Sequence, residues 1–403
     1  MPEKEVAQLS TPVMPIIDTD THLSEPPDLW TSRLPSKWSE LAPKVVFDER
    51  RGEDIWIIGG RRLSGVSGYA MAGWHEYPPK HPPSAETADP AAFDAKERVK
   101  RMDAMKIAAE VPYPNLLAFS MDAFMGYNEP ELVLDCIRAY NDFLTEFASV
   151  APERFVCLTT LPFWDLDEAV KEMNRCHDNG HRGINFIAKP YKLGLPRLRE
   201  DHWAPILKAA EERQLSVNFH VGYQSQTEED WVRMIKDVQG PADYAQETTM
   251  SLMGLCENVS ELLLSGVCHK YPGLNFVNVE SGFGWIPYLI ESADWNWKNS
   301  GAAKAHPDRE LPSHYFRKQI YTTYWFERET VRYMGAAYAD NLMFETDFPH
   351  PTSLSPGPAS TAMSPREVVD ETLNELPMDA CRKIFYENAA RLYHIDVEAC
   401  LQN

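Results

Sequence analysis

The stretch PIIDTDTHLSEPPDLW (residues 15–30) begins with a short apolar run and ends in a loop broken by two prolines. The run PIID (15–18) has the length and composition of a buried strand. Asp20 and His22 follow it, and residues i and i+2 of an extended strand face the same side. We therefore expect the two side chains to point the same way. A carboxylate and an imidazole in this arrangement are suitable metal ligands.

Seven more β-rich runs alternate with segments of helical periodicity along the chain. They are AAEVPY (108–113), RFVCLTTL (154–161), GINFI (183–187), LSVNFH (215–220), LNFVNVE (274–280), QIYTTYWF (319–326) and NLMFETD (341–347). The clearest helices are PELVLDCIRAYNDFLTEFASV (130–150) and DLDEAVKEMNRCHDNG (165–180). Eight strands alternating with helices predict parallel βαβ units. This count favours a closed (β/α)8 TIM barrel over a doubly wound open sheet, which is the structural alternative.

Two segments are longer than the repeat requires. Residues 41–90 lie between the first two predicted strands and are rich in Pro, Gly and aromatic residues, and residues 221–246 follow the fifth strand. Loops of this length are typically lids, substrate walls or subunit contacts. The chain contains no linker, repeat or low-complexity tract. We therefore predict one α/β domain over residues 1–403, a distorted TIM barrel with two insertions.

Composition restricts the class of protein. The 403 residues include 39 Lys+Arg and 60 Asp+Glu, for a formal net charge of -21, which argues against nucleic acid or an anionic membrane as a partner. The N-terminus lacks a signal-peptide pattern, and no apolar run approaches the ~20 residues that span a bilayer. The 7 cysteines are scattered, with no Cys-x-x-Cys pair, as is usual in a reducing compartment. These features predict a cytoplasmic enzyme.

The active site of a TIM barrel lies at the C-terminal ends of its strands, so polar residues that end apolar runs are informative. They are Asp20 and His22 after the first strand, His220 after the fifth, Glu280 after the sixth, and Asp347 with His350 after the eighth. Alone, His220 is also typical of a hydrogen-bonded core histidine, and Asp347 of a helix cap. Together the residues predict a divalent metal site, because three carboxylates at one barrel mouth would repel one another without a cation.

Four segments carry a resemblance to a known family. They are DTDTHLSEPPDLW, GVCHKYPGLNFVNVESGFGWIPYL, ETDFPHPTS and IFYENAARLY, and together they resemble the amidohydrolase-related family, also called amidohydrolase 2, of the aminocarboxymuconate-semialdehyde decarboxylase type. The similarity extends over essentially the whole chain. It implies a distorted TIM barrel with a divalent metal. The family's ligands correspond to Asp20, His22, His220 and Asp347.

The chain departs from the family's common pattern at two positions. Many members have His-x-His on the first strand where this chain has Asp20-x-His22, and the decarboxylases place a histidine at the position of Glu280. Glu280 is therefore either a general acid or base beside one ion, or itself a ligand. In the second interpretation it would join His350 and the other donors around a pair of iron or manganese ions that activates dioxygen. The family includes a small oxygenase branch of this kind, for example 2-aminoisobutyrate hydroxylase, and the EPPDLW and VESG segments are similar to it.

These considerations lead to three functional hypotheses. The first is a dinuclear iron and/or manganese monooxygenase that uses O2 to hydroxylate a small organic or amino acid, with Glu280 and His350 at the reacting centre. The alternative is a mononuclear Zn or Mn decarboxylase or hydrolase of a small carboxylic acid. The third is a non-catalytic subunit that supports a related chain. The predicted partners are a small-molecule carboxylate and further subunits, in a homo-oligomer or a hetero-oligomer with a related chain.

Overall fold

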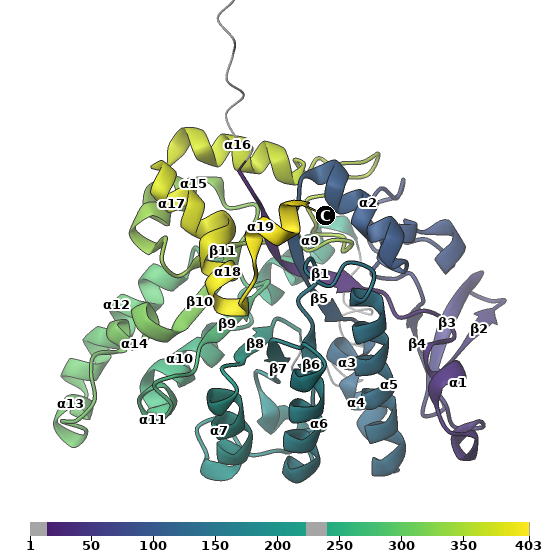
Figure 1. The fold of residues 1–403 in the computed structure, drawn as a ribbon, viewed down its shortest axis with the longest axis horizontal. Coiled ribbons are helices and arrows are strands. Elements are labelled where there is room, and N and C mark those ends of the chain that lie inside the picture. The colour runs from purple at the N-terminus through teal and green to yellow at the C-terminus, as the bar shows by residue number, and fades with distance from the viewer. Residues whose placement is uncertain (1–13, 223–239, 403) are drawn as a thin grey trace, which may run out of the picture.

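The computed structural model describes residues 14–222 and 240–402 (Figure 1). Within these residues all eight predicted strands form, and neighbouring strands are parallel. They are β1 (Ile17–Leu23), β5 (Ala109–Pro114), β6 (Leu158–Thr160), β7 (Gly183–Asn185), β8 (Ser216–His220), β9 (Phe276–Val279), β10 (Ile320–Tyr324) and β11 (Leu342–Phe344). The first strand is longer than predicted, so that Asp20 and His22 lie within it.

The strands follow one another in chain order around the molecule, but their hydrogen-bonded ladders are interrupted. One sheet contains β6 to β11 in consecutive order, and a second pairs β1 with β5. Single bridges join the two sheets, between Glu110 and Phe155 on one side and between Thr21 and Phe348 on the other. Consecutive order lacks the reversal that defines a doubly wound sheet, which excludes that alternative. The prediction of a barrel closed by continuous hydrogen bonding is therefore wrong. Several strands are too short for it, since β6, β7 and β11 have only three residues each.

Helices surround the strands (Figure 1). The predicted helices 130–150 and 165–180 form as α5 (Pro130–Ala148) and α6 (Leu166–Asp178), and Gly180 follows α6 with a φ of 95°. The other helices are α1 (Leu29–Arg33), α2 (Ala95–Met105), α3 (Leu116–Phe119), α4 (Met121–Met125), α7 (Ala204–Glu212), α9 (Pro241–Ser251), α10 (Cys256–Ser265), α11 (Val267–Lys270), α12 (Ile286–Asn299), α13 (Ala302–Ala305), α14 (Pro312–Gln319), α15 (Arg328–Met334), α16 (Pro365–Glu375), α17 (Met378–Arg382), α18 (Asn388–Tyr393) and α19 (Val397–Gln402).

The first predicted insertion, residues 41–90, contains a small antiparallel sheet at the edge of the molecule (Figure 1). Its strands are β2 (Lys44–Asp48), β3 (Glu53–Ile58) and β4 (Arg61–Gly65). Trp56 and Ile58 of β3 are buried in the same apolar cluster as the helices around the strands, which attaches this sheet to the rest of the protein. Most of the second insertion, 221–246, lies outside the described residues.

The C-terminal helix α18 packs against the N-terminal ends of the strands. Leu392 and Tyr393 share an apolar cluster with early strand residues such as Ile17, Ala109 and Leu158. Burial of these apolar side chains closes one end of the ring of strands. It stabilises the fold by about 25 cal/mol for each Å² of apolar surface removed from water. Polar side chains lie at the opposite end, where the strands terminate.

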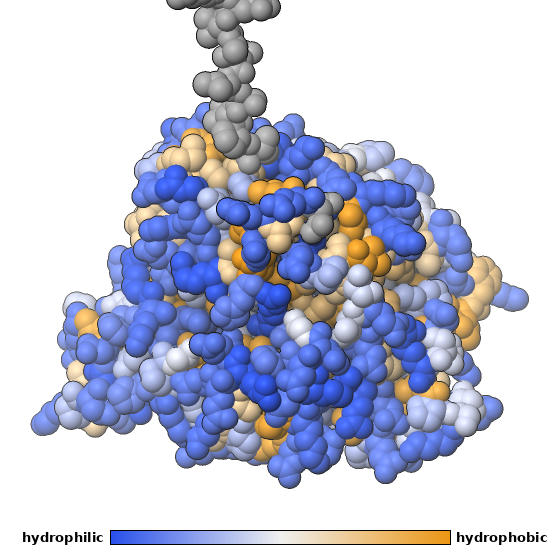
Figure 2. Space-filling view, viewed as in Figure 1, coloured by the Kyte–Doolittle hydropathy of each residue, from blue (hydrophilic) through white to orange (hydrophobic). Residues whose placement is uncertain are grey.

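The face of the molecule seen in Figure 2 is mostly hydrophilic, in accordance with the 60 Asp+Glu residues of the chain. Among the described residues, no helix combines the length and the apolar character that crossing a bilayer requires.

Candidate metal centre

The six predicted donor residues converge at the C-terminal ends of the strands. They form two overlapping groups whose possible ligand atoms lie within 4.8 Å of one another. The first group contains Asp20, His22, His220 and Glu280, and the second contains His22, Glu280, Asp347 and His350. The geometry predicted from strand ends is therefore present, although the donors are separated by more than 300 positions in the sequence.

Two imidazoles and a carboxylate form the deepest part of the cluster. His22 Nε2 lies 3.0 Å from His220 Nε2, and Asp20 Oδ1 lies 3.5 Å and 3.4 Å from these two nitrogens. Two nitrogens bound to one ion at about 2.1 Å would be about 3.0 Å apart at an octahedral angle and about 3.4 Å apart at a tetrahedral one. The spacing of the two imidazoles therefore suits ligands of a common ion.

Asp20 provides a second test of whether a metal fits. Its side chain is fully buried, and neither carboxylate oxygen accepts a hydrogen bond from any described residue. A buried carboxylate without a donor or a cation is costly. A divalent cation would satisfy both oxygens, and the mixture of carboxylates and imidazoles suits manganese, iron or zinc.

Hydrogen bonds from outside the cluster set the tautomers of two histidines, as we infer from their partners. His220 Nδ1 lies 2.6 Å from the carbonyl oxygen of Val221, so it carries the proton and leaves Nε2 as the ligand atom. His350 Nε2 lies 2.9 Å from Asn115 Oδ1, and Asn115 Nδ2 is oriented by the carbonyl oxygen of Leu23. His350 therefore donates through Nε2. Its Nδ1 faces Asp347 Oδ1 at 2.9 Å.

The backbone is strained at two of the donors. Glu280 and Asp347 have φ angles of 51° and 58°, in the left-handed region that non-glycine residues seldom adopt. Such conformations cost about 1–3 kcal/mol each and are found preferentially at functional sites. Here they turn the chain at the ends of β9 and β11, at the positions where both carboxylates enter the cluster.

Burial shifts the pKa values of four of the six donors, Asp20, His22, His220 and Glu280, towards their neutral forms. It lowers the pKa of His220 to about 4, and burial together with His350 and His220 lowers that of His22. Burial, followed by the charges of Asp347 and Asp18, raises the pKa of Asp20 well above its usual range. The imidazoles of His22 and His220 are therefore in the form that binds metal, and a metal ion bound to Asp20 would displace its proton.

Glu280 also has a pKa well above its usual range, and burial is the main cause, followed by Asp347, Asp20 and Glu345. Glu280 and His350 are 7% and 5% exposed, whereas Asp20, His22 and Asp347 are at 0% and His220 at 1%. The two residues predicted to be catalytic therefore lie nearest to the open side of the cluster.

Several supporting residues were not anticipated from the sequence. Thr352 Oγ1 donates to Asp347 Oδ2, and Glu345 Oε2 accepts the backbone N–H of Glu280 at 3.3 Å. Asn115 and Glu345 directly follow the ends of β5 and β11. They occupy the same kind of position as the predicted donors, so the strand-end signal was available for both.

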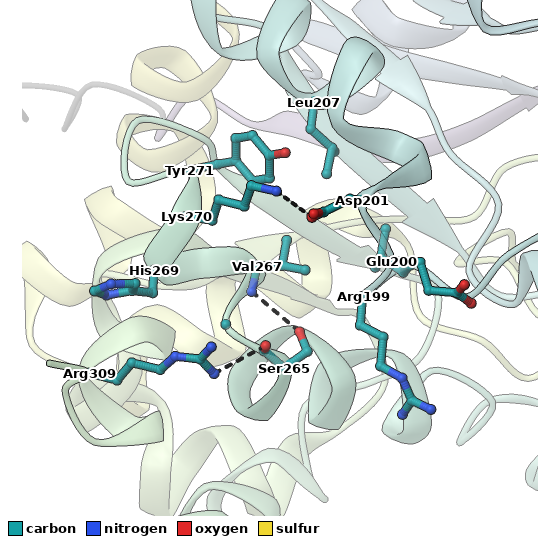
Figure 3. A pocket seen from close by; sticks show the side chains of 12 residues that line it. Arg199, Glu200, Asp201, Leu207, Ser265, Val267, His269, Lys270, Tyr271 and Arg309 are labelled. Carbon is teal, nitrogen blue, oxygen red and sulfur yellow. Dashed lines mark hydrogen bonds and ion pairs between the residues drawn. The ribbon is translucent and has the colours of Figure 1, made fainter. Parts of the chain in front are cut away.

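A cavity of about 510 Å³ lies elsewhere, among α7, α11 and the segment around Arg309 (Figure 3). None of the six donors lines it. Several of its charged groups have partners in the protein, since Lys270 pairs with Asp201 at 2.5 Å and Arg309 donates to the carbonyl oxygen of Ser265. We therefore place the functional site at the donor cluster.

Comparison with known proteins agrees with this fold and site. The amidohydrolase 2 family model, described as Amidohydrolase, matches residues 17–395. Curated relatives include the gamma-resorcylate decarboxylase of Rhizobium sp. (strain MTP-10005), which is 26% identical over 269 residues, or 62% of this chain and 76% of that protein.

Two solved structures show the same fold. An amidohydrolase from Mycobacterium avium subsp. paratuberculosis K-10 superposes with a TM-score of 0.72 at 20% identity, over 95% of this chain and 100% of that one. A dihydroxybenzoic acid decarboxylase from Polaromonas sp. JS666, with bound manganese and the inhibitor 2-nitroresorcinol, has a TM-score of 0.59 at 18% identity, over 95% and 97% of the two chains.

These relatives confirm the predicted family but not the finer resemblance to its oxygenase branch, because those named for an activity are aromatic-acid decarboxylases. The matched region includes all six donors of the cluster. The chain therefore belongs to the amidohydrolase 2 family of metal-dependent enzymes.

Proposed function

We propose that this protein is a metal-dependent, non-oxidative decarboxylase of a small aromatic carboxylic acid. The observation that carries the proposal is the position of Glu280, which lies on the more exposed side of a cluster of metal donors and whose pKa is raised by burial. Loss of CO2 from an aromatic acid requires a proton at the carbon that loses it, and Glu280 is placed to supply one. The aromatic-acid decarboxylases among the relatives support the same reaction class.

Asp20, His22, His220 and Asp347 would hold the ion, which acts when bound as a Lewis acid on a substrate oxygen. As the bond between the ring carbon and the carboxylate breaks, its electron pair remains on the ring carbon and CO2 leaves. The carboxyl proton of Glu280 then moves to that carbon. Glu280 is left as a carboxylate and regains a proton from water.

The residues around the cluster keep its members in place during this step. Asn115 orients the ring of His350, and Thr352 donates to Asp347, so neither side chain rotates freely. Glu280 Oε2 lies 3.4 Å from His220 Nε2, close to the donors but on their exposed side.

A second candidate remains the dinuclear iron or manganese monooxygenase. The observation that favours it is the second donor group, in which Glu280 and His350 join Asp347 and His22. Two groups of four that share two members contain enough ligands for two ions. In that case Glu280 is a ligand rather than an acid.

Metal content and gas exchange distinguish the two candidates. We expect about one manganese or zinc ion per chain, and CO2 release from hydroxybenzoates such as 2,6-dihydroxybenzoate without oxygen. Two iron or manganese ions per chain and substrate-dependent oxygen consumption would establish the second candidate instead. No CO2 release from any hydroxybenzoate by metal-loaded protein would refute the decarboxylase proposal.

The variant Glu280→Gln tests the role of this residue. If Glu280 is the acid, turnover should fall about 10²- to 10⁴-fold while the metal content is unchanged. Glu327→Gln is a matched control, because Glu327 is also partly buried and accepts two backbone N–H groups, of Phe283 and Gly284, that glutamine can still satisfy. Loss of metal from Glu280→Gln would instead identify a ligand.

A further inference from the structure

An aromatic wall covers the three histidines of the metal centre. The ring of Phe119 lies 5.7 Å from His22, 5.6 Å from His220 and 5.8 Å from His350. Tyr69 extends this wall, with its ring 5.2 Å from Phe119 and 5.4 Å from His350. The wall thus combines α3 with a residue that follows the small antiparallel sheet.

Gly222 explains how Phe119 comes so close to the cluster. A Cβ atom at this position would lie 2.7 Å from the Phe119 ring, and the φ of Gly222 is +76°. Glycine is the residue that combines such a φ with no side chain. The end of β8 is therefore shaped to hold an aromatic ring beside the donors.

The hydroxyl group of Tyr69 has no hydrogen-bond partner among residues 14–222 and 240–402, although Tyr69 is partly buried. A tyrosine hydroxyl group that has no partner in the protein can donate to a bound molecule.

In the described part of the chain, no lysine or arginine forms an ion pair with any of the six donors. Arg98 donates to Glu110, to Ala91 and to the carbonyl oxygen of His22, and Arg101 donates to Ser355. A neutral hydroxyl group is a suitable donor for a substrate oxygen that the metal does not bind.

We propose that Tyr69 is a substrate-binding residue that selects planar aromatic carboxylic acids. Its O–H donates to a carboxylate oxygen of the substrate, while the substrate's ring lies against Phe119. This assignment rests on the proposed function for its substrate class. It gives the first insertion the role of a substrate wall, which was one of the roles typical of so long a loop.

The proposal can be tested by calorimetric binding of benzoate and salicylate to the manganese-loaded protein. Tyr69→Phe should weaken the binding of both acids by about tenfold or more, because one hydrogen bond to a charged oxygen is lost. Metal content and melting temperature should not change, since the hydroxyl has no partner in the protein. The matched control is Tyr77→Phe in the same insertion, whose side chain is 67% exposed and which should bind like the wild type.

A second variant tests the wall itself. Phe119→Leu should weaken the binding of benzoate about two- to tenfold relative to that of cyclohexanecarboxylate, because only the aromatic acid loses a contact between two aromatic rings. The assignment is overturned if Tyr69→Phe binds benzoate and salicylate as tightly as the wild type, or if the wild type binds neither. If the wild type binds both through Tyr69 yet releases no CO2, the proposed function fails and the binding role of Tyr69 stands.

Discussion

Glu25, three residues beyond His22, supports the metal centre without being one of its donors. Its Oε1 accepts the backbone N–H groups of Asn115 at 3.0 Å and Leu116 at 2.8 Å. Asn115 in turn orients His350. The position of His350 therefore depends on a buried acid two contacts away, and burial raises the pKa of Glu25 to about 7.

The raised pKa of Glu25 leads to a prediction for the stability of the variant Glu25→Gln. The pKa in the folded state lies above the ordinary 4.5, so wild-type metal-free protein should lose stability as the pH rises from 4.5 through 7. The loss from this group should be about 3 kcal/mol. Glu25→Gln should therefore match the wild type near pH 4.5 and exceed its free energy of unfolding at pH 8, as measured by urea denaturation.

Glu129→Gln, at an exposed position, serves as the control and should show no such difference. A stability difference between Glu25→Gln and wild type that is the same at every pH would contradict the prediction.

The donors were predictable from the sequence, whereas their supporting residues were largely not. His220 and Asp347 end long apolar runs, and such runs reveal where a buried parallel strand stops. Tyr69 and Phe119 lie in segments without a strand-end pattern, and only the folded chain brings them to the histidines. Backbone strain at Glu280 likewise depends on tertiary contacts that no local pattern records.

At the level of elements, the eight strands were predicted because each is a compact apolar run between helices. The small antiparallel sheet was not, although its hairpin has a recognisable signal. Gly59 and Gly60 join β3 to β4 with φ angles of 58° and 76°, the positive values that a two-residue type I′ turn needs. The sequence IIGGRR carries this signal. The broken ladders were not predictable, because the length of a strand depends on tertiary packing.

Arg98 of α2 connects three elements around the site. Its guanidinium, fully buried, donates to Glu110 of β5 at 3.0 Å, to the carbonyl oxygen of Ala91 at 2.6 Å and to that of His22 in β1 at 2.5 Å. One planar group thereby fixes the helix, both strands of the β1–β5 pair and the end of the insertion.

Arg98→Lys should therefore destabilise the protein by about 3 kcal/mol or more, because an ammonium group cannot make these contacts at once and Glu110 would lose its paired charge. The free energy of unfolding from urea denaturation measures this. Arg50→Lys, an exposed replacement of the same type, should have little effect. A change below about 0.5 kcal/mol in Arg98→Lys would contradict the role assigned to Arg98.

The molecule carries two sets of acidic groups, one exposed and one buried. Most of the net charge of -21 is on exposed residues, where salt screens repulsion over a Debye length of about 10 Å at 0.1 M. A second set, including Asp18, Asp20, Glu280, Glu345 and Asp347, is buried beside the metal centre. Salt reaches this second set poorly, whereas a divalent ion that binds there interacts with the carboxyl groups directly and displaces their protons.

These two sets should respond separately in thermal unfolding of the metal-free protein. Sodium chloride should raise the melting temperature and saturate at a few hundred millimolar, because it screens only the exposed charge. Micromolar Mn²⁺ added at saturating salt should raise it further, since an ion that binds only the folded state adds stability in proportion to RT ln(1 + [L]/Kd). Asp20→Asn should retain the response to salt and lose most of the response to Mn²⁺. An equal response of Asp20→Asn and wild type to Mn²⁺ would mean that the ion binds the acidic surface instead of the buried donors.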